Sequence, residues 1–334
     1  SVKYNIGIDA TLFKGLNLTV DAFLDKRSNI LTLDNSKMGY YGKQYVFSNV
    51  GEMTNRGFEA SAMYSGKSGD FSYRVNGMVS YAKNTIDYMA EVTPANAFSA
   101  QTGRPYGTYI GLEAERFYDV ADFDNAGNLK SGIPVPAFGS VQPGDVKYKD
   151  LDGNNVVDQN DVTQIGKSPY PEWYYSFGGK IGWKGFDLEV LFQGAAGVSV
   201  NLLDNWNQTV AFVNNGNAYE IAKGAWAYYP TEGIDTRATA RYPRLTTQNN
   251  ENNYQTSSLW IKNADYLKLR NLELGYNFDN LKLQKAGIDN LRIYLSGQNL
   301  FTFSGLLKNY NLDPERISGY PTVRSYNVGV SITF

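Results

Sequence analysis

Six positions in one short loop have the residue types and the spacing of a calcium-binding loop. They are Asp150, Asp152, Asn154, Val156, Asp158 and Asp161, at relative positions 1, 3, 5, 7, 9 and 12. In an EF-hand loop these positions supply the ligands, and position 7 contributes its backbone carbonyl. Because Ca²⁺ prefers several oxygen ligands around one point, the spacing predicts a structural calcium site that stiffens the loop.

Two positions of this loop depart from the EF-hand pattern. Position 6 is Asn155 rather than Gly, and position 12 is Asp161 rather than Glu. Asn tolerates the left-handed backbone that position 6 requires, and the shorter Asp ligates through one oxygen or through water. The alternative interpretation is a solvated turn cluster of Asp, Asn and Gly without a metal ion.

The composition of the chain limits the chemistry that it could perform. The 334 residues include no His and no Cys. Ser-His-Asp and Cys-His nucleophiles and the usual zinc and iron ligands are therefore missing. Paired carboxylates remain available for acid–base chemistry, but we expect a protein that is not an enzyme. With 31 Lys and Arg against 33 Asp and Glu, no basic surface for nucleic acid is expected.

Alternating side chains predict that the loop is carried by β-strands. From Tyr326 to Phe334 the even positions are apolar and the odd positions are polar or small, which gives a strand one apolar face. That face includes the last residue, as in a barrel whose outer face meets lipid. Aromatic residues make up 14% of the chain, and Tyr and Trp gather at membrane–water interfaces. No apolar run is long enough for a transmembrane helix, and residues 1–13 begin in a strand pattern without a signal peptide.

The same alternation predicts about nine long strands with short and long connections in turn. Short turns are expected at 13–16, 65–70 and 183–186, with a helical turn at 279–288. Long connections are expected at 32–50, 86–171, 200–258 and 304–323. A register change after Leu269 predicts a bulge. If Phe334 lies in the periplasm, every long connection, including 86–171 and 200–258, lies outside the cell.

Nine strands predict an incomplete barrel. Bacterial single-chain barrels have an even number of strands, and open sheet edges are forbidden in lipid. We therefore expect residues 1–334 to form the C-terminal part of a larger all-β barrel, or to be completed by another chain. The alternative fold is a soluble β-sandwich or propeller, which the one-sided aromatic faces and unequal loop lengths fit poorly.

The second half of the chain contains four motifs, GDVKYKDLDGNNVVDQNDVTQIGKSPYPEWYYSFGGKIGWKGFDLEVLFQG, NADYLKLRNLELGYNF, LRIYLSGQNLFTFSG and YPTVRSYNVGVSITF. In sequence and in order they resemble the SusC/RagA family of TonB-dependent outer-membrane transporters. The first 85 residues match only in pattern. The resemblance implies a 22-stranded barrel with a plugged lumen, of which this chain supplies the last strands.

The resemblance also implies partners and a location. A SusC-like transporter works in the outer membrane of a gram-negative bacterium as a multi-pass protein, with a SusD-like surface lipoprotein as its lid. TonB–ExbB–ExbD would act through a plug and an N-terminal segment that are absent from this chain. The implied function is energy-coupled import of an oligosaccharide or peptide. The alternatives are a passive or structural outer-membrane barrel, and a soluble glycan-binding β-protein.

Aromatic residues in the predicted loops are candidate substrate contacts, because rings stack on sugars and peptide side chains. They are Tyr106, Trp206, Trp226, Tyr228 and Tyr229. The alternative is that these rings pack the loops or lie at the membrane interface. The charged residues that face inward, from Asp9 to Arg292, are expected to form a hydrated lumen wall, and Asp313-Pro314-Glu315 is expected to be a turn with polar caps.

Overall fold

The computed structural model describes residues 1–35, 47–278 and 287–334, and its main element is one antiparallel sheet. Nine strands pair in the order β1-β2-β3-β4-β11-β12-β17-β18-β19. Their bounds are Val2–Leu12 (β1), Leu16–Leu33 (β2), Phe47–Ser68 (β3), Phe71–Tyr88 (β4), Trp173–Trp183 (β11), Phe186–Ala196 (β12), Tyr266–Phe278 (β17), Asn290–Ser304 (β18) and Ser325–Thr333 (β19). The predicted all-β fold and its number of long strands are therefore confirmed, and the sheet fits the C-terminal part of a large barrel.

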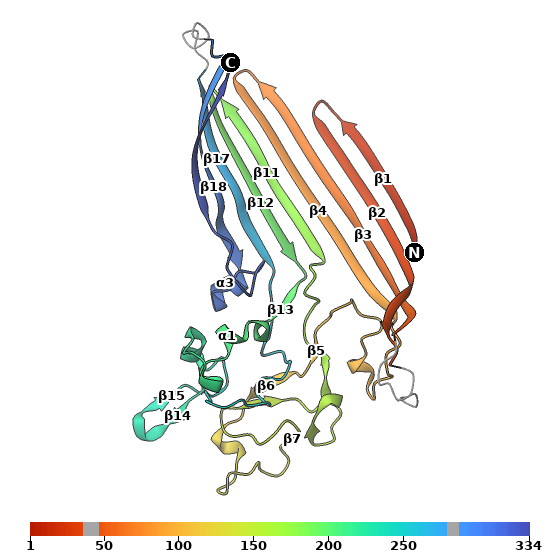
Figure 1. Ribbon diagram of the computed structural model, residues 1–334, viewed down its shortest axis with the longest axis vertical. Coiled ribbons are helices and arrows are strands. Elements are labelled where there is room, and N and C mark those ends of the chain that lie inside the picture. Colours follow the sequence, from red (N-terminus) through yellow and green to blue (C-terminus); the bar gives the residue numbers. More distant parts are fainter. Residues whose placement is uncertain (36–46, 279–286) are drawn as a thin grey trace.

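The short turns and the C-terminus lie at one end of the sheet, and the folded connections lie at the other (Figure 1). The turn between β1 and β2 spans Phe13 to Gly15, and Lys184-Gly185 joins β11 to β12. Gly15 has φ 104° and Gly185 has φ 87°, a left-handed backbone that glycine adopts without steric cost. The hairpin turns were predicted because this turn chemistry is local to the sequence.

One predicted connection was too long, and the connection predicted at 304–323 agrees with the structure to within one residue at each end. Residues up to Leu33 belong to β2 and residues from Phe47 belong to β3, so the expected loop at 32–50 is shorter than predicted. The strand β18 continues to Ser304 and is followed by helix α3 (Gly305–Tyr310). The predicted bulge is confirmed, since the pairing of β17 with β18 shifts register between Leu269 and Asn271. The helical turn expected at 279–288 falls almost wholly outside the described residues.

One face of the sheet is apolar and exposed. Ile6, Val328 and Phe334 have 73%, 76% and 83% of their surface accessible. An uninterrupted apolar face of this size is unusual on a protein surrounded by water. It is the arrangement of a barrel wall whose outer side meets lipid.

Aromatic rings border this apolar face at both ends. Near the folded connections, Tyr81 contacts Trp173 and Phe58 with ring centroids 4.4 Å and 6.0 Å away. Near the short turns, ring pairs include Tyr64 with Tyr73 and Phe186 with Tyr276. Along β4, the ten steps from Phe71 to Tyr81 cover about 34 Å at ~3.4 Å per residue. At a strand tilt of about 40° this is ~26 Å of height, close to the apolar band of an outer-membrane barrel.

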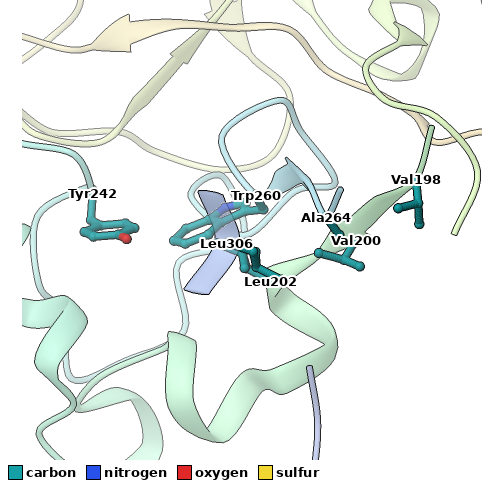
Figure 2. Close-up of a cluster of buried hydrophobic side chains, with 7 residues drawn as sticks. All are labelled: Val198, Val200, Leu202, Tyr242, Trp260, Ala264 and Leu306. Atoms are coloured by element: carbon teal, nitrogen blue, oxygen red, sulfur yellow. The ribbon is translucent and has the colours of Figure 1, made fainter. Parts of the chain in front are cut away.

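Small apolar cores lie within and between the long connections. One core joins residues of the 197–265 connection to α3 and consists of Val198, Val200, Leu202, Tyr242, Trp260, Ala264 and Leu306 (Figure 2). A second joins Leu112, Val146, Tyr148 and Val157, and a third joins Tyr118, Phe123 and Val141. These cores make the connections a folded assembly rather than separate loops.

Short elements make up the rest of this assembly. The strands are Ile110–Gly111 (β5), Ala114–Phe117 (β6), Val135–Pro136 (β7), Val146–Tyr148 (β8), Val156–Val157 (β9), Thr163–Gln164 (β10), Ser199–Asn201 (β13), Tyr228–Tyr229 (β14), Ile234–Asp235 (β15) and Ile261–Asn263 (β16). The helical segments are Trp206–Thr209 (α1) and the 3₁₀ turns at Ala97–Ser99, Val120–Asp122, Gln159–Asp161, Leu202–Asn205, Val213–Asn215, Glu220–Gly224 and Pro230–Glu232. Within the described residues, no helix has the length and apolar character needed to cross a bilayer.

Candidate functional site

Three of the predicted calcium ligands converge in the folded structure. Asp150, Asp152 and Asp161 each bring a carboxylate oxygen within 4.8 Å of the other two. Asp161 is fully buried, Asp150 is half-buried and Asp152 is exposed. Partial desolvation raises the pKa of Asp152, and the neighbouring carboxylates of Asp161 and Asp150 raise it further. Three like charges this close together favour a cation among them.

The backbone of this loop follows the predicted turn. Asn155, at position 6, has φ 67° and so adopts the left-handed conformation that the loop requires. The carboxylate of Asp150 accepts hydrogen bonds from the N–H groups of Gly153 (2.7 Å) and Asn155 (2.8 Å), which wraps the chain around its first residue. Val157 is buried in the second apolar core, and its strand β9 pairs with β7. The loop is therefore anchored to the folded assembly.

Asn154, Asp158 and Asp161 also accept hydrogen bonds from backbone N–H groups within the loop. Asn154 accepts a hydrogen bond from the N–H of Val156 (2.7 Å), and Asp158 accepts one from the N–H of Asn160 (2.7 Å). Asp161 accepts hydrogen bonds from the backbone N–H groups of Leu151 and Asp158, at 2.7 Å and 2.9 Å. The structure thus groups three of the four predicted carboxylate ligands and leaves the calcium site a prediction.

A buried carboxylate that sequence reasoning missed joins the two longest connections. Asp145 has no accessible surface. It accepts hydrogen bonds from Nε of Arg244 (2.7 Å), from the side-chain amides of Asn250 (3.0 Å) and Asn253 (2.9 Å), and from the backbone N–H of Gln142 (2.8 Å). Its side-chain partners lie about a hundred residues further along the chain, so no local spacing could reveal them.

A second polar cluster ties the last connection to the sheet. Lys268 is 1% exposed and donates hydrogen bonds to Asp313 (2.9 Å) and Glu315 (2.5 Å), while Arg270 and Tyr266 also donate to Glu315. Burial opposes ionisation of Glu315, but the hydrogen bonds from Arg270, Lys268 and Tyr266 lower its pKa to about 2. The expected turn at Asp313-Pro314-Glu315 thus also anchors the last connection to the sheet. The sequence signal for this anchor was the pair of basic residues beside the bulge, Lys268 and Arg270.

The predicted aromatic substrate contacts have different environments. Tyr106 stacks on Tyr170, with ring centroids 6.5 Å apart. The other four belong to the 197–265 connection, in the following environments. Trp206 is 37% exposed and packs edge-on against Tyr254, Trp226 is 9% exposed, Arg237 lies 3.9 Å above the ring of Tyr228, and Tyr229 is exposed. They do not form a single site.

A cleft of about 740 Å³ lies elsewhere in the folded assembly, between the 202–242 segment and the residues around α3. Three basic residues line it, namely Lys223, Arg241 and Lys308. Its one acidic lining residue is Glu220, which pairs with Lys223 at 3.5 Å. Apolar, tyrosine, threonine and asparagine side chains make up most of the remaining lining. None of the five predicted aromatic contacts borders this cleft.

The sequence is similar to curated proteins over its whole length, although no family model matches. It is 27% identical to TonB-dependent receptor P3 of Formosa agariphila, over 100% of this chain and 34% of that protein. It is 24% identical to TonB-dependent receptor SusC of Bacteroides thetaiotaomicron, over 100% of this chain and 32% of that protein. The chain therefore spans about a third of the length of these relatives.

The fold is similar to solved structures of the RagAB peptide transporter. One of them superimposes with a TM-score of 0.69 at 21% identity, over 99% of this chain and 35% of that chain. The RagAB peptide importer in its open-open state gives 0.70 at 20% identity. The resemblance predicted from the motifs is therefore confirmed as a similarity: over its whole length the chain is similar to SusC and to other TonB-dependent receptors, and its fold is similar to that of RagAB.

Proposed function

We propose that this chain supplies part of the barrel wall and the extracellular connections of a TonB-dependent importer in the outer membrane of a gram-negative bacterium. The observation that carries the proposal is the exposed apolar face of the nine-stranded sheet, bordered by aromatic rings at both ends. Similarity to TonB-dependent receptors over the whole chain supports it. The proposal places the connections at 86–171 and 200–258 outside the cell and assigns no catalytic step to the chain.

The proposed cargo is an oligosaccharide or a peptide. Substrate would be held between the barrel and a SusD-like surface lipoprotein, and TonB–ExbB–ExbD would then act on a plug domain to open a path. The RagAB structures are described as a peptide transporter, which supports peptides as one class of cargo. Tyr106 and Tyr229 keep exposed ring surface for stacking, whereas the burial of Trp226 favours a packing role.

Uptake by cells that express the transporter containing this chain tests the proposal. Labelled oligosaccharides and peptides should enter only when TonB and the lipoprotein are both present. Uptake that continues at the same rate in a strain without TonB would indicate a passive barrel instead. A protein that stays in solution without detergent would contradict a membrane location altogether.

We also propose that Asp150, Asp152 and Asp161 hold a structural Ca²⁺, with Asn154, Val156 and Asp158 completing the shell. The convergence of three carboxylates in a loop with EF-hand spacing supports this. Titration calorimetry on the intact transporter should detect Ca²⁺ binding that Asp152→Ala removes. Asp124→Ala is the matched control, since Asp124 caps a turn in the same connection but lies outside the cluster. Equal binding by both variants would refute the site.

A further inference from the structure

Three basic residues form a row on the outer face of the sheet, directly beyond one aromatic band. Lys26 follows Leu24 on β2, Arg56 precedes Phe58 on β3, and Lys83 follows Tyr81 on β4. Residues two apart on a strand share a face, so the three basic side chains lie on the same face as the apolar band. The pairing places them at the end of the band that is away from the short turns at 13–15 and 69–70, and Figure 1 shows the folded connections at that end of the sheet.

The pairing of the strands brings these charges together. Arg56 is the register partner of Lys83 on one side and of Leu24 on the other. Side chains directly opposite one another in an antiparallel pair are about 5 Å apart at Cβ, and like charges in this position are destabilising. The arrangement of Arg56 and Lys83 therefore costs stability unless an anion lies against them.

The described residues supply little compensating charge. Lys83 approaches Glu172 at 3.8 Å, and Glu172 is shared with Lys167 at the same distance. Lys26 and Arg56 are exposed, and no carboxylate in the described parts of the chain pairs with them. The outward Asp87 lies further from the aromatic band and accepts a hydrogen bond from Thr54.

We propose that Lys26, Arg56 and Lys83 bind the phosphate groups of an anionic membrane lipid. The inference rests on the proposed function, which places this face of the sheet in a bilayer. Tyr and Trp rings lie at the headgroup level of a membrane, so the next outward position along each strand is at the level of lipid phosphates. Arg binds phosphate through two parallel hydrogen bonds, and basic clusters beside a membrane-spanning segment recognise anionic headgroups.

Lipid binding by the purified transporter tests the assignment. Bis-phosphorylated lipid A, dephosphorylated lipid A and inorganic phosphate are each titrated into the detergent-solubilised protein, and binding is followed by native mass spectrometry. Variants are Lys26→Gln, Arg56→Gln, Lys83→Gln and the triple variant. Arg74→Gln is the matched control, because Arg74 lies on the opposite face of β4.

Each neutralisation should weaken binding of the phosphorylated lipid about fivefold, and the control should bind like the unmodified protein. Dephosphorylated lipid should bind equally weakly to all variants. Equal affinity of the triple variant and the control for phosphorylated lipid would overturn the proposal, as would inorganic phosphate that binds as tightly as the lipid. Heat-modifiable gel mobility shows separately whether each variant is a folded barrel, so failure of the lipid site is distinguishable from failure of the proposed function.

Discussion

Removal of the Asp145 carboxylate should release the two longest connections from one another. Asp145 is fully buried and accepts hydrogen bonds from Arg244, Asn250 and Asn253 across the interface between these connections. Asp145→Ala would leave a guanidinium and two amides without their acceptor. The perturbation therefore affects charge and hydrogen bonding together.

The size of the effect follows from the burial of the pair. Breaking a buried ion pair by removing one partner costs about 3–5 kcal/mol. The side chain of Arg244 is 26% exposed and regains some hydration, so about 3 kcal/mol is expected for Asp145→Ala. Asp145→Asn keeps one acceptor oxygen but loses the charge, and a hydrogen bond to a charged group contributes about 1.5–3 kcal/mol. We therefore expect about 2 kcal/mol for that variant.

Limited proteolysis and tryptophan fluorescence during denaturation measure this loss. The indole N–H of Trp260 donates to the backbone of Asn253 at 2.7 Å, so its fluorescence reports on the same interface. The folded connections of Asp145→Ala should unfold at lower denaturant concentration than the barrel wall. Asp235→Ala is the control, because Asp235 forms an exposed ion pair with Arg237 at 2.8 Å, and such pairs contribute little. Equal protease resistance of the two variants would refute the reasoning.

Three further predictions concern neighbouring features. Because the pKa of Glu315 is lowered to about 2 in the folded protein, its anchoring contribution is complete above its ordinary pKa of about 4.3 and is lost as pH falls from there towards 2. Cleavage in the 311–324 segment by an acid-active protease should rise over that range. Glu315→Gln should remove the part of this change that comes from Glu315 and leave the part that comes from Asp313, whose pKa is also lowered. Gly144→Ala should destabilise the connections, since Gly144 has φ 90° and an added Cβ would lie 2.4 Å from the ring of Trp226; unchanged thermal unfolding would contradict this. If Ca²⁺ binds, a concentration 100-fold above Kd should stabilise the protein by about 2.7 kcal/mol, and chelation should remove that gain from the unmodified protein but leave Asp152→Ala unchanged.

The sequence predicted the parts of the fold that depend on local pattern. The alternation of apolar and polar residues in β1, β2 and β19 predicted which side chains share a face of the sheet. The register change after Leu269 predicted the bulge. The ends of β2 and β3 were not predicted, because beyond the apolar band the outward residues Glu52, Thr54 and Arg56 are polar, as they would be in a loop.

Among the candidate sites, only the one whose residues are close in sequence was predicted. The Asp-rich loop was found because its carboxylates are close in sequence, and three of them do converge. The partners of Asp145 and the cleft beside α3 depend on how long connections pack, which no local spacing records. Burial of Lys268 depends on the bulge, which changes the side of the sheet on which alternate residues lie.

The length of β3 has a mechanical consequence. Its 22 residues extend over about 71 Å at ~3.4 Å per step, or about 55 Å of height at a tilt of about 40°. The apolar band takes up only about half of that height. The remainder is a hydrogen-bonded ribbon shared with β2 and β4, and its pairing shifts register near Ile30 and Met53. The connection that follows β4 is hydrogen-bonded to this ribbon through Ile86. A force on the folded connections would therefore reach the sheet through paired strands as well as through single chain segments.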